Sequence, residues 1–198
     1  MKKLLMTTAA ALGLLLWPHL APAQDQKTPV YVDLTTSKGD IVLELNPAAA
    51  PQTVANFVGY VEAGHYNGTI FHRVIGNFMI QGGGLDKALK EKSAKAPIKN
   101  EANNGLKNEK YALAMARTGD PHSATAQFFI NTKDNEFLNF KAENAQGWGY
   151  AVFGKVVKGQ AVVDEIAKSK TGKVSAYDDV PVIPVTIDKA VVLKDYKK

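Results

Sequence analysis

Alternating apolar and polar positions near the start of the chain predict a β-hairpin. Apolar side chains recur at every second position over residues 30–34 and again over residues 41–45. Lys38 and Gly39 stand between these two runs, and a glycine there suits the tight turn that joins antiparallel strands. The pattern therefore predicts two antiparallel strands joined by a short turn.

Two other stretches have the spacing of amphipathic helices. Residues 51–64 place apolar side chains three and four positions apart, with Pro51 suited to a first helical turn and Gly64 suited to a C-terminal stop. Residues 160–170, "QAVVDEIAKSK", show the same spacing and carry lysines near the end. The apolar positions that define the first helix are Val54, Phe57, Val58 and Val61.

Short β-like runs fill much of the remaining chain and bring the predicted number of strands to eight. Glycine, asparagine and proline turns separate them, which favours an antiparallel barrel or sandwich over alternating strands and helices. The two helices would then cover the open ends of a barrel, so the fold class is mainly β. The further runs lie at about residues 69–75, 78–81, 111–116, 127–132, 151–157 and 185–193.

The three consecutive glycines at 82–84 are interpreted as the end of one of these strands. Glycine weakens a strand and allows the backbone to bend sharply. The following segment is polar, rich in lysine and weakly periodic. We therefore expect residues 83–110 to form a long surface loop.

The N-terminal segment has the layout of a cleavable secretory signal peptide. A basic start, "MKK", precedes an apolar run over residues 4–17 and the small-residue triplet that ends at Ala23. A membrane anchor is less favoured, because Pro18 interrupts a run already shorter than the roughly 20 residues that span a bilayer. We expect residues 1–23 to be removed and residues 24–198 to form one domain, which is periplasmic, or secreted where the host has no outer membrane.

Composition removes several classes of chemistry. The chain has no cysteine, which excludes disulfides, thiol redox catalysis and thiolate metal sites. His65, His72 and His122 are not at metal-ligand spacing, and no serine stands in a nucleophile-elbow pattern, so we expect no metal and no cofactor. The net charge of +5 falls to +3 without Lys2 and Lys3 and is spread along the chain, which gives little reason to expect nucleic acid as a partner.

An arginine and two glutamines accompany the aromatic residues in two of the predicted strands. In "NFMIQ", Met79 and Gln81 share one face of a strand while Phe78 and Ile80 share the other. In "AQFFIN" at 126–131, the glutamine and the second phenylalanine likewise share a face. These residues could line a shallow apolar pocket rimmed by hydrogen-bond donors, or the aromatics could be ordinary core. Periodicity alone leaves both interpretations open.

Four stretches together give the chain a family resemblance. "FHRVIGNFMIQGGG", "AMARTGDPHSATAQFFIN", "FLNF" and "YAVFGKVVKG" occur in this order and resemble the cyclophilin family of peptidyl-prolyl cis-trans isomerases. The likeness extends from about residue 30 to the C-terminus. It implies a closed eight-stranded antiparallel barrel capped by two helices, and an enzyme that rotates Xaa-Pro peptide bonds without a cofactor.

The resemblance also assigns site residues. It implies that Arg73 is catalytic and that the apolar side chains at positions 78, 79, 129 and 138 surround the substrate proline. The glutamines at 81 and 127 would make polar contacts, and residues 116 and 117 would lie along the bound peptide. The implied substrate-binding residues are Phe78, Met79, Gln81, Ala116, Arg117, Gln127, Phe129, Phe137, Leu138 and Tyr150.

Three departures from many eukaryotic relatives qualify the expected partners. Phe137 stands where they have tryptophan, Tyr150 where they have histidine, and Arg117 with Thr118 where they have Asn-Ala. The tryptophan contacts cyclosporin in the family, so the smaller ring implies weakened binding of that drug. The expected partners are proline-containing peptides and unfolded exported proteins, and the expected state is a monomer.

Two further functional interpretations remain at this stage. A proline-binding module or holdase would use the same groove without depending on catalysis, and motifs do not separate it from an isomerase. Binding to nucleic acid rests only on the basic pI of about 9.2, and lysines on a solvated loop explain that value more simply.

Overall fold

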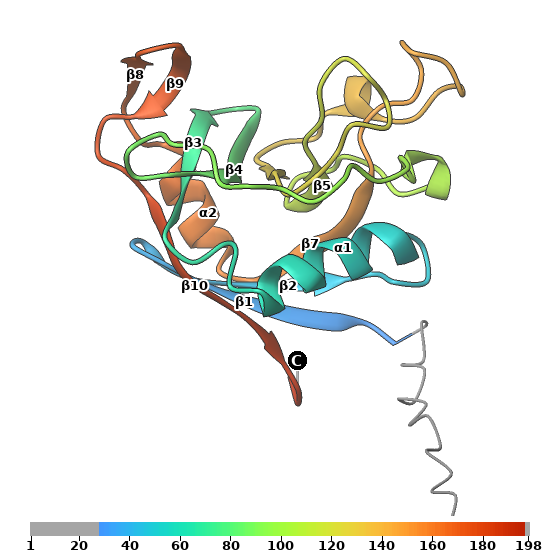
Figure 1. The fold of residues 1–198 in the computed structure, drawn as a ribbon, viewed down its shortest axis with the longest axis horizontal. Coiled ribbons are helices and arrows are strands. Elements are labelled where there is room, and N and C mark those ends of the chain that lie inside the picture. The colour runs from blue at the N-terminus through green and yellow to red at the C-terminus, as the bar shows by residue number, and fades with distance from the viewer. Residues whose placement is uncertain (1–27, 197–198) are drawn as a thin grey trace, which may run out of the picture.

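Eight antiparallel strands close into a barrel in the computed structural model, which describes residues 28–196 (Figure 1). Their order around the barrel is β1-β10-β3-β4-β6-β5-β7-β2, so the first and last strands are neighbours. The predicted closed barrel is confirmed, while the predicted signal peptide at residues 1–23 lies outside the described residues. The barrel strands are β1 Val30–Thr36, β2 Gly39–Leu45, β3 Thr69–Ile75, β4 Met79–Asp86, β5 Ala112–Met115, β6 Phe128–Asn131, β7 Val152–Lys158 and β10 Thr186–Leu193.

Both predicted helices form and pack against barrel strands. Helix α1 spans Pro51–Glu62 and contacts β10, whereas α2 spans Gln160–Ala167 and contacts β2, β3 and β4. Each helix turns its apolar side toward the same core, to which α1 contributes Phe57 and α2 contributes Val163. Within residues 28–196, neither these nor any other helix has the length and apolar character needed to cross a membrane.

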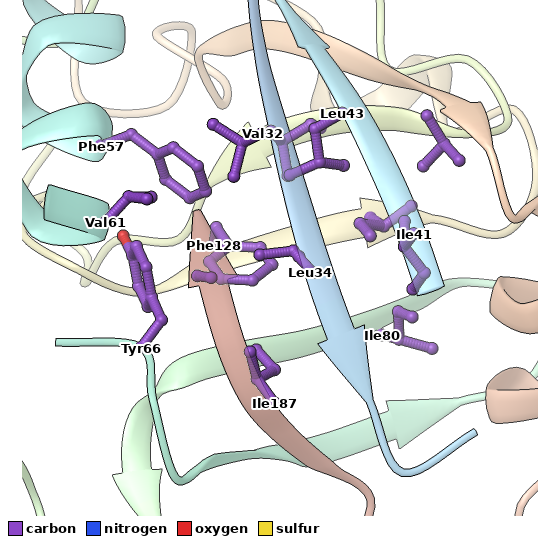
Figure 2. Packing of buried hydrophobic residues seen from close by; sticks show 14 of the residues in the cluster. Val32, Leu34, Ile41, Leu43, Phe57, Val61, Tyr66, Ile80, Phe128 and Ile187 are labelled. Carbon is purple, nitrogen blue, oxygen red and sulfur yellow. The ribbon is translucent and has the colours of Figure 1, made fainter. Parts of the chain in front are cut away.

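The core is built from alternate residues of the barrel strands and from aromatic rings. Figure 2 shows Val32 and Leu34 of β1 beside the rings of Phe57 and Phe128. Those two rings meet edge to face with their centroids 5.4 Å apart, an arrangement that aromatic pairs prefer. Burying each large apolar side chain contributes about 1.5–3 kcal/mol, so these contacts dominate the stability of the barrel.

The three glycines at 82–84 lie inside β4, and the prediction that they end the strand is wrong. A Cβ atom on Gly83 would lie 2.8 Å from the Tyr66 ring and 3.0 Å from the Phe128 ring. One on Gly84 would lie 2.5 Å from the side chain of Gln127. Glycine is required here because neighbouring side chains pack directly onto the strand backbone. The surface loop therefore begins after Asp86 rather than at residue 83.

The long loop is attached to the first helix by a carboxylate. Glu101 Oε2 accepts hydrogen bonds from the backbone nitrogen of Thr53 at 2.8 Å and from the Thr53 hydroxyl at 2.6 Å, and Glu101 Oε1 accepts one from the Gln52 nitrogen at 3.1 Å. These bonds satisfy backbone donors at the N-terminus of α1, where a negative charge is also favoured by the helix dipole. The loop thus completes the helix that precedes it.

A two-stranded hairpin outside the barrel was not predicted. Strand β8 spans Thr171–Val174, strand β9 spans Tyr177–Pro181, and β9 lies against β3 (Figure 1). Most of their side chains do not enter the core. Their sequence is therefore largely polar and lacks the period of two by which a strand is predicted. Helix α2 ends at Ala167, before the predicted end at residue 170, so residues 171–181 can form the hairpin.

Replacing Gly83 by alanine should destabilise the protein more than the same change at Gly105. Both glycines have positive φ, 87° and 85°, but the space around Gly105 is open for at least 4 Å. Gly105→Ala should therefore cost about 1–2 kcal/mol for the left-handed backbone alone. Gly83→Ala should cost about 1–3 kcal/mol more because the new methyl group meets two rings. Urea unfolding followed by circular dichroism measures both, and equal losses would contradict the crowding.

Candidate active site

A second apolar cluster lies outside the barrel core, on the outer face of β4, β6, β5 and β7. The alternation along β6 separates the two: Phe128 enters the core, whereas Phe129 belongs to the outer cluster. In β4, Met79 faces outward and Ile80 faces inward in the same way. The aromatic pair in "AQFFIN" is thus half core and half outer surface. The buried members of the outer cluster are Met79, Ala112, Ala114, Phe129, Leu138 and Val152.

Two connecting segments border this cluster. Phe78 lies in the turn before β4, and Phe137 and Leu138 belong to a short 3-10 helix, η2, at Glu136–Leu138. The rings of Phe78 and Phe137 stack with centroids 5.7 Å apart, and Phe137 remains 63% exposed. The prediction that Phe78 shares a strand face with Ile80 is wrong, because Phe78 precedes the strand and packs with the outer cluster.

Buried asparagine amides hold both connecting segments in place. Asn135 Nδ2 donates to the backbone oxygen of Phe78 at 2.8 Å and to Asn131 Oδ1 at 2.7 Å. Asn131 Nδ2 donates to Asn108 Oδ1 at 3.2 Å, and Asn108 Nδ2 donates to the Leu138 carbonyl at 3.2 Å. A buried amide network of this kind fixes geometry, because breaking it leaves unpaired polar groups in a dry interior. Nothing in the sequence pattern predicts this role for the three asparagines.

Arg73 stands in line with the outer cluster. In the strand register Arg73 pairs with Gln81, and Gln81 pairs with Phe129, so the three residues follow one another across β3, β4 and β6. Directly paired residues share a face of a sheet. Gln81 Nε2 also donates to Gln127 Oε1 at 2.9 Å. The row places a half-exposed guanidinium and two side-chain amides along one side of the apolar surface.

Arg117 and Tyr150 form the opposite side. The Arg117 guanidinium lies over the Tyr150 ring, 4.6 Å from its centroid, and its Nε donates to the Gly149 carbonyl at 2.9 Å. The Tyr150 ring in turn meets Phe129 edge to face at 5.6 Å. Ala116 packs against the same cluster. The eleven residues that the resemblance assigned to the site thus lie in or beside the outer cluster, Arg73 and Gln127 through their contacts with Gln81.

The residue before Arg73 is a buried neutral histidine. Burial lowers the pKa of His72 to about 4, and its Nδ1 has no hydrogen-bond partner within residues 28–196. Near neutral pH the imidazole is uncharged, so it adds no second positive charge beside the guanidinium. Over the same residues, no group of three or more histidine, aspartate or glutamate side chains is arranged to hold a metal ion.

Comparison with known proteins agrees with this geometry. Residues 31–192 match the family described as cyclophilin type peptidyl-prolyl cis-trans isomerase/CLD. The chain is 62% identical over 162 residues to peptidyl-prolyl cis-trans isomerase cyp18 of Streptomyces antibioticus, covering 82% of this chain and 98% of that relative. It is 48% identical over 186 residues to peptidyl-prolyl cis-trans isomerase A of Dickeya dadantii, covering 94% and 96%.

Solved structures show the same likeness. A cyclophilin type isomerase of Cryptosporidium parvum superposes with a TM-score of 0.69 at 26% identity, covering 85% of this chain and all of the other. A second structure of that protein was determined in the presence of the dipeptide Ala-Pro, and superposes with a TM-score of 0.68 at 26% identity, covering 83% and 99%.

Stability should fall as the pH drops from about 6.5 to about 4, and His72 should account for much of the loss. The unfolded chain binds a proton on this histidine near pH 6.5, whereas the folded protein does so only near pH 4. Protonation therefore favours unfolding by about 3 kcal/mol over this range. His72→Gln should flatten the pH dependence of urea unfolding, leaving the smaller contribution of His65, whose pKa burial also lowers.

Urea unfolding of the parent and of His72→Gln at the same pH values provides the comparison. A parent profile that does not change between pH 7 and pH 4.5, or an identical slope in the His72 variant, would refute the assignment.

Proposed function

Because the chain belongs to the cyclophilin-type peptidyl-prolyl cis-trans isomerase family, we propose that Arg73 is the catalytic donor and that unfolded exported proteins are the substrates. The chain is an isomerase of Xaa-Pro peptide bonds. The observation that carries the assignment of Arg73 is its place in the register, one strand beyond Gln81 and in line with Phe129.

The reaction requires no reactive group. Rotation about an Xaa-Pro bond breaks no covalent link, but it must overcome amide resonance, whose barrier of about 18–20 kcal/mol makes the uncatalysed step take about 10–100 s. An enzyme for this reaction needs groups that favour the twisted amide over the planar one. A fixed donor beside an apolar surface meets that need.

Arg73 supplies the donor. In the twisted state the lone pair of the proline nitrogen is localised and accepts a hydrogen bond, which the planar amide does not do. A guanidinium placed near that nitrogen therefore stabilises the transition state more than the ground state. Arginine suits the role because it is always protonated and its planar fork can also contact the carbonyl before the proline.

The outer cluster holds the proline ring. Phe129, Met79 and Leu138 are almost completely buried and provide an apolar base, and the stacked rings of Phe78 and Phe137 form a wall. Holding the ring while the carbonyl side turns converts a diffusing peptide into an oriented one. A millionfold acceleration requires about 8 kcal/mol, which the donor, the apolar surface and orientation would share.

The polar residues on either side would hold the rest of the peptide. Gln81 and Gln127 offer amides next to Arg73, and Ala116, whose N–H donates to the Gln127 carbonyl at 3.0 Å, has only its carbonyl to offer beside Arg117. The Ala-Pro dipeptide named for the Cryptosporidium parvum relative supports a proline peptide as the ligand of such a surface.

The signal-peptide layout of residues 1–23 supports a role outside the cytoplasm. We propose that this segment is removed after Ala23 and that the single domain of residues 24–198 acts as a monomer on proteins folding in the periplasm. The match to isomerase A of Dickeya dadantii, which extends over 94% of the chain, is in keeping with a role shared with that relative.

Arg73→Ala should remove most of the isomerase activity without unfolding the protein. The side chain is 44% exposed and lies outside the core, so its loss leaves the barrel intact. Loss of one positioned transition-state donor lowers kcat by about a hundredfold or more. Arg73→Lys keeps the charge but not the fork and should restore only part of the rate. Exchange NMR on a short Xaa-Pro peptide measures this, and turnover equal to the parent's would remove Arg73 from the mechanism.

Phe137→Trp should strengthen inhibition by cyclosporin. Phe137 is exposed at the edge of the site, where an indole would add contact area and an N–H donor. A gain of about 1.4 kcal/mol corresponds to about tenfold tighter inhibition. Phe140→Trp, in the same segment but packed against Trp148, should leave inhibition unchanged. Equal effects of the two substitutions would show that position 137 does not limit drug binding.

A further inference from the structure

The hairpin formed by β8 and β9 brings a carboxylate to the proposed catalytic arginine. Asp179 Oδ2 of β9 lies 3.9 Å from Arg73 Nε, and the two side chains are 41% and 44% exposed. We propose that Asp179 is a positioning residue, which restrains the Arg73 guanidinium over the site so that its terminal nitrogens face the peptide. The inference rests on the proposed role of Arg73.

Asp179 is held in a backbone conformation that few residues adopt. Its φ is 59°, in the left-handed region that aspartate and asparagine tolerate better than most other residues with a Cβ atom. Such a conformation persists only where its surroundings enforce it. Here β9 pairs with β8, for example Val180 with Gly172. On the other side, the ring of Tyr177 meets His72 of β3 edge to face at 6.4 Å. The hairpin and β3 together direct this carboxylate.

The geometry divides the guanidinium between two tasks. A separation of 3.9 Å is an ion-pair distance and too long for a hydrogen bond, so Asp179 attracts Arg73 without consuming a donor. The attraction acts on the Nε edge, which leaves the four N–H groups of the terminal nitrogens for the substrate. Without it, a half-exposed arginine samples many rotamers, and only some of them direct donors at a proline nitrogen.

The adjacent residue supplies a matched control. Asp178 Oδ1 pairs with Lys173 across the hairpin at 3.2 Å, and both side chains are more than half exposed. The two neighbouring carboxylates thus have different partners, Lys173 of the hairpin for Asp178 and Arg73 of β3 for Asp179. Replacing either by asparagine removes one negative charge, but only the change at Asp179 removes a charge beside Arg73.

A double-mutant cycle on the full mature chain tests the proposal. Asp179→Asn retains a residue suited to positive φ and should lower kcat about threefold with little change in KM, because orientation rather than affinity is lost. Asp178→Asn should match the parent. In an Arg73→Ala background, Asp179→Asn should have no effect, since its target is absent. Raising salt to about 0.5 M should slow the parent toward the Asp179→Asn variant and leave that variant unchanged.

Three results would overturn the role of Asp179: a parent-like kcat in Asp179→Asn, an equal loss in Asp178→Asn, or an undiminished effect in the Arg73→Ala background. The last would indicate that Asp179 acts through the fold, which urea unfolding of the same variants would also register. Failure of the proposed function gives a different outcome, because Arg73→Ala alone would then retain full activity.

Discussion

The site depends on the strict alternation of side chains along β6. Phe128 enters the barrel and packs against Phe57 and Tyr66, and because it does so, Phe129 must face outward into the second cluster. A slip of one residue would exchange the two rings and destroy core and site together. The close packing of Phe128 onto the glycine backbone of β4 sets this register, so the stability of the core and the geometry of the outer surface have one cause.

Much of this arrangement could be predicted from the sequence, and the failures share a physical origin. Periods of 2 and 3.6 residues identified the barrel strands and both helices, and the resemblance named residues that lie in or beside the outer cluster. The glycines at 82–84 were misinterpreted, because their composition reveals a permissive backbone but not the ring of Tyr66 or the Gln127 side chain opposite. The hairpin at 171–181 and the amide network of Asn135 were missed since their roles depend on long-range contacts.

Catalysis of bond rotation requires fixed geometry more than reactive groups. In this molecule a buried hydrogen-bond network provides that rigidity. Amides of Asn108, Asn131 and Asn135 connect the turn that carries Phe78 with the 3-10 helix that carries Leu138. The turn and the 3-10 helix are thereby linked in one hydrogen-bonded network.

The pairing of β1 with β10 has a consequence for how the protein comes into existence. Val32 of the first strand lies opposite Val192 of the last, so the barrel has no closed form until nearly the whole chain is present. During synthesis, which begins at the N-terminus, the edge of β1 that pairs with β10 therefore stays unpaired until β10 has been made. The chain is an isomerase of Xaa-Pro bonds, and its own barrel stays open until its last strand has been synthesised.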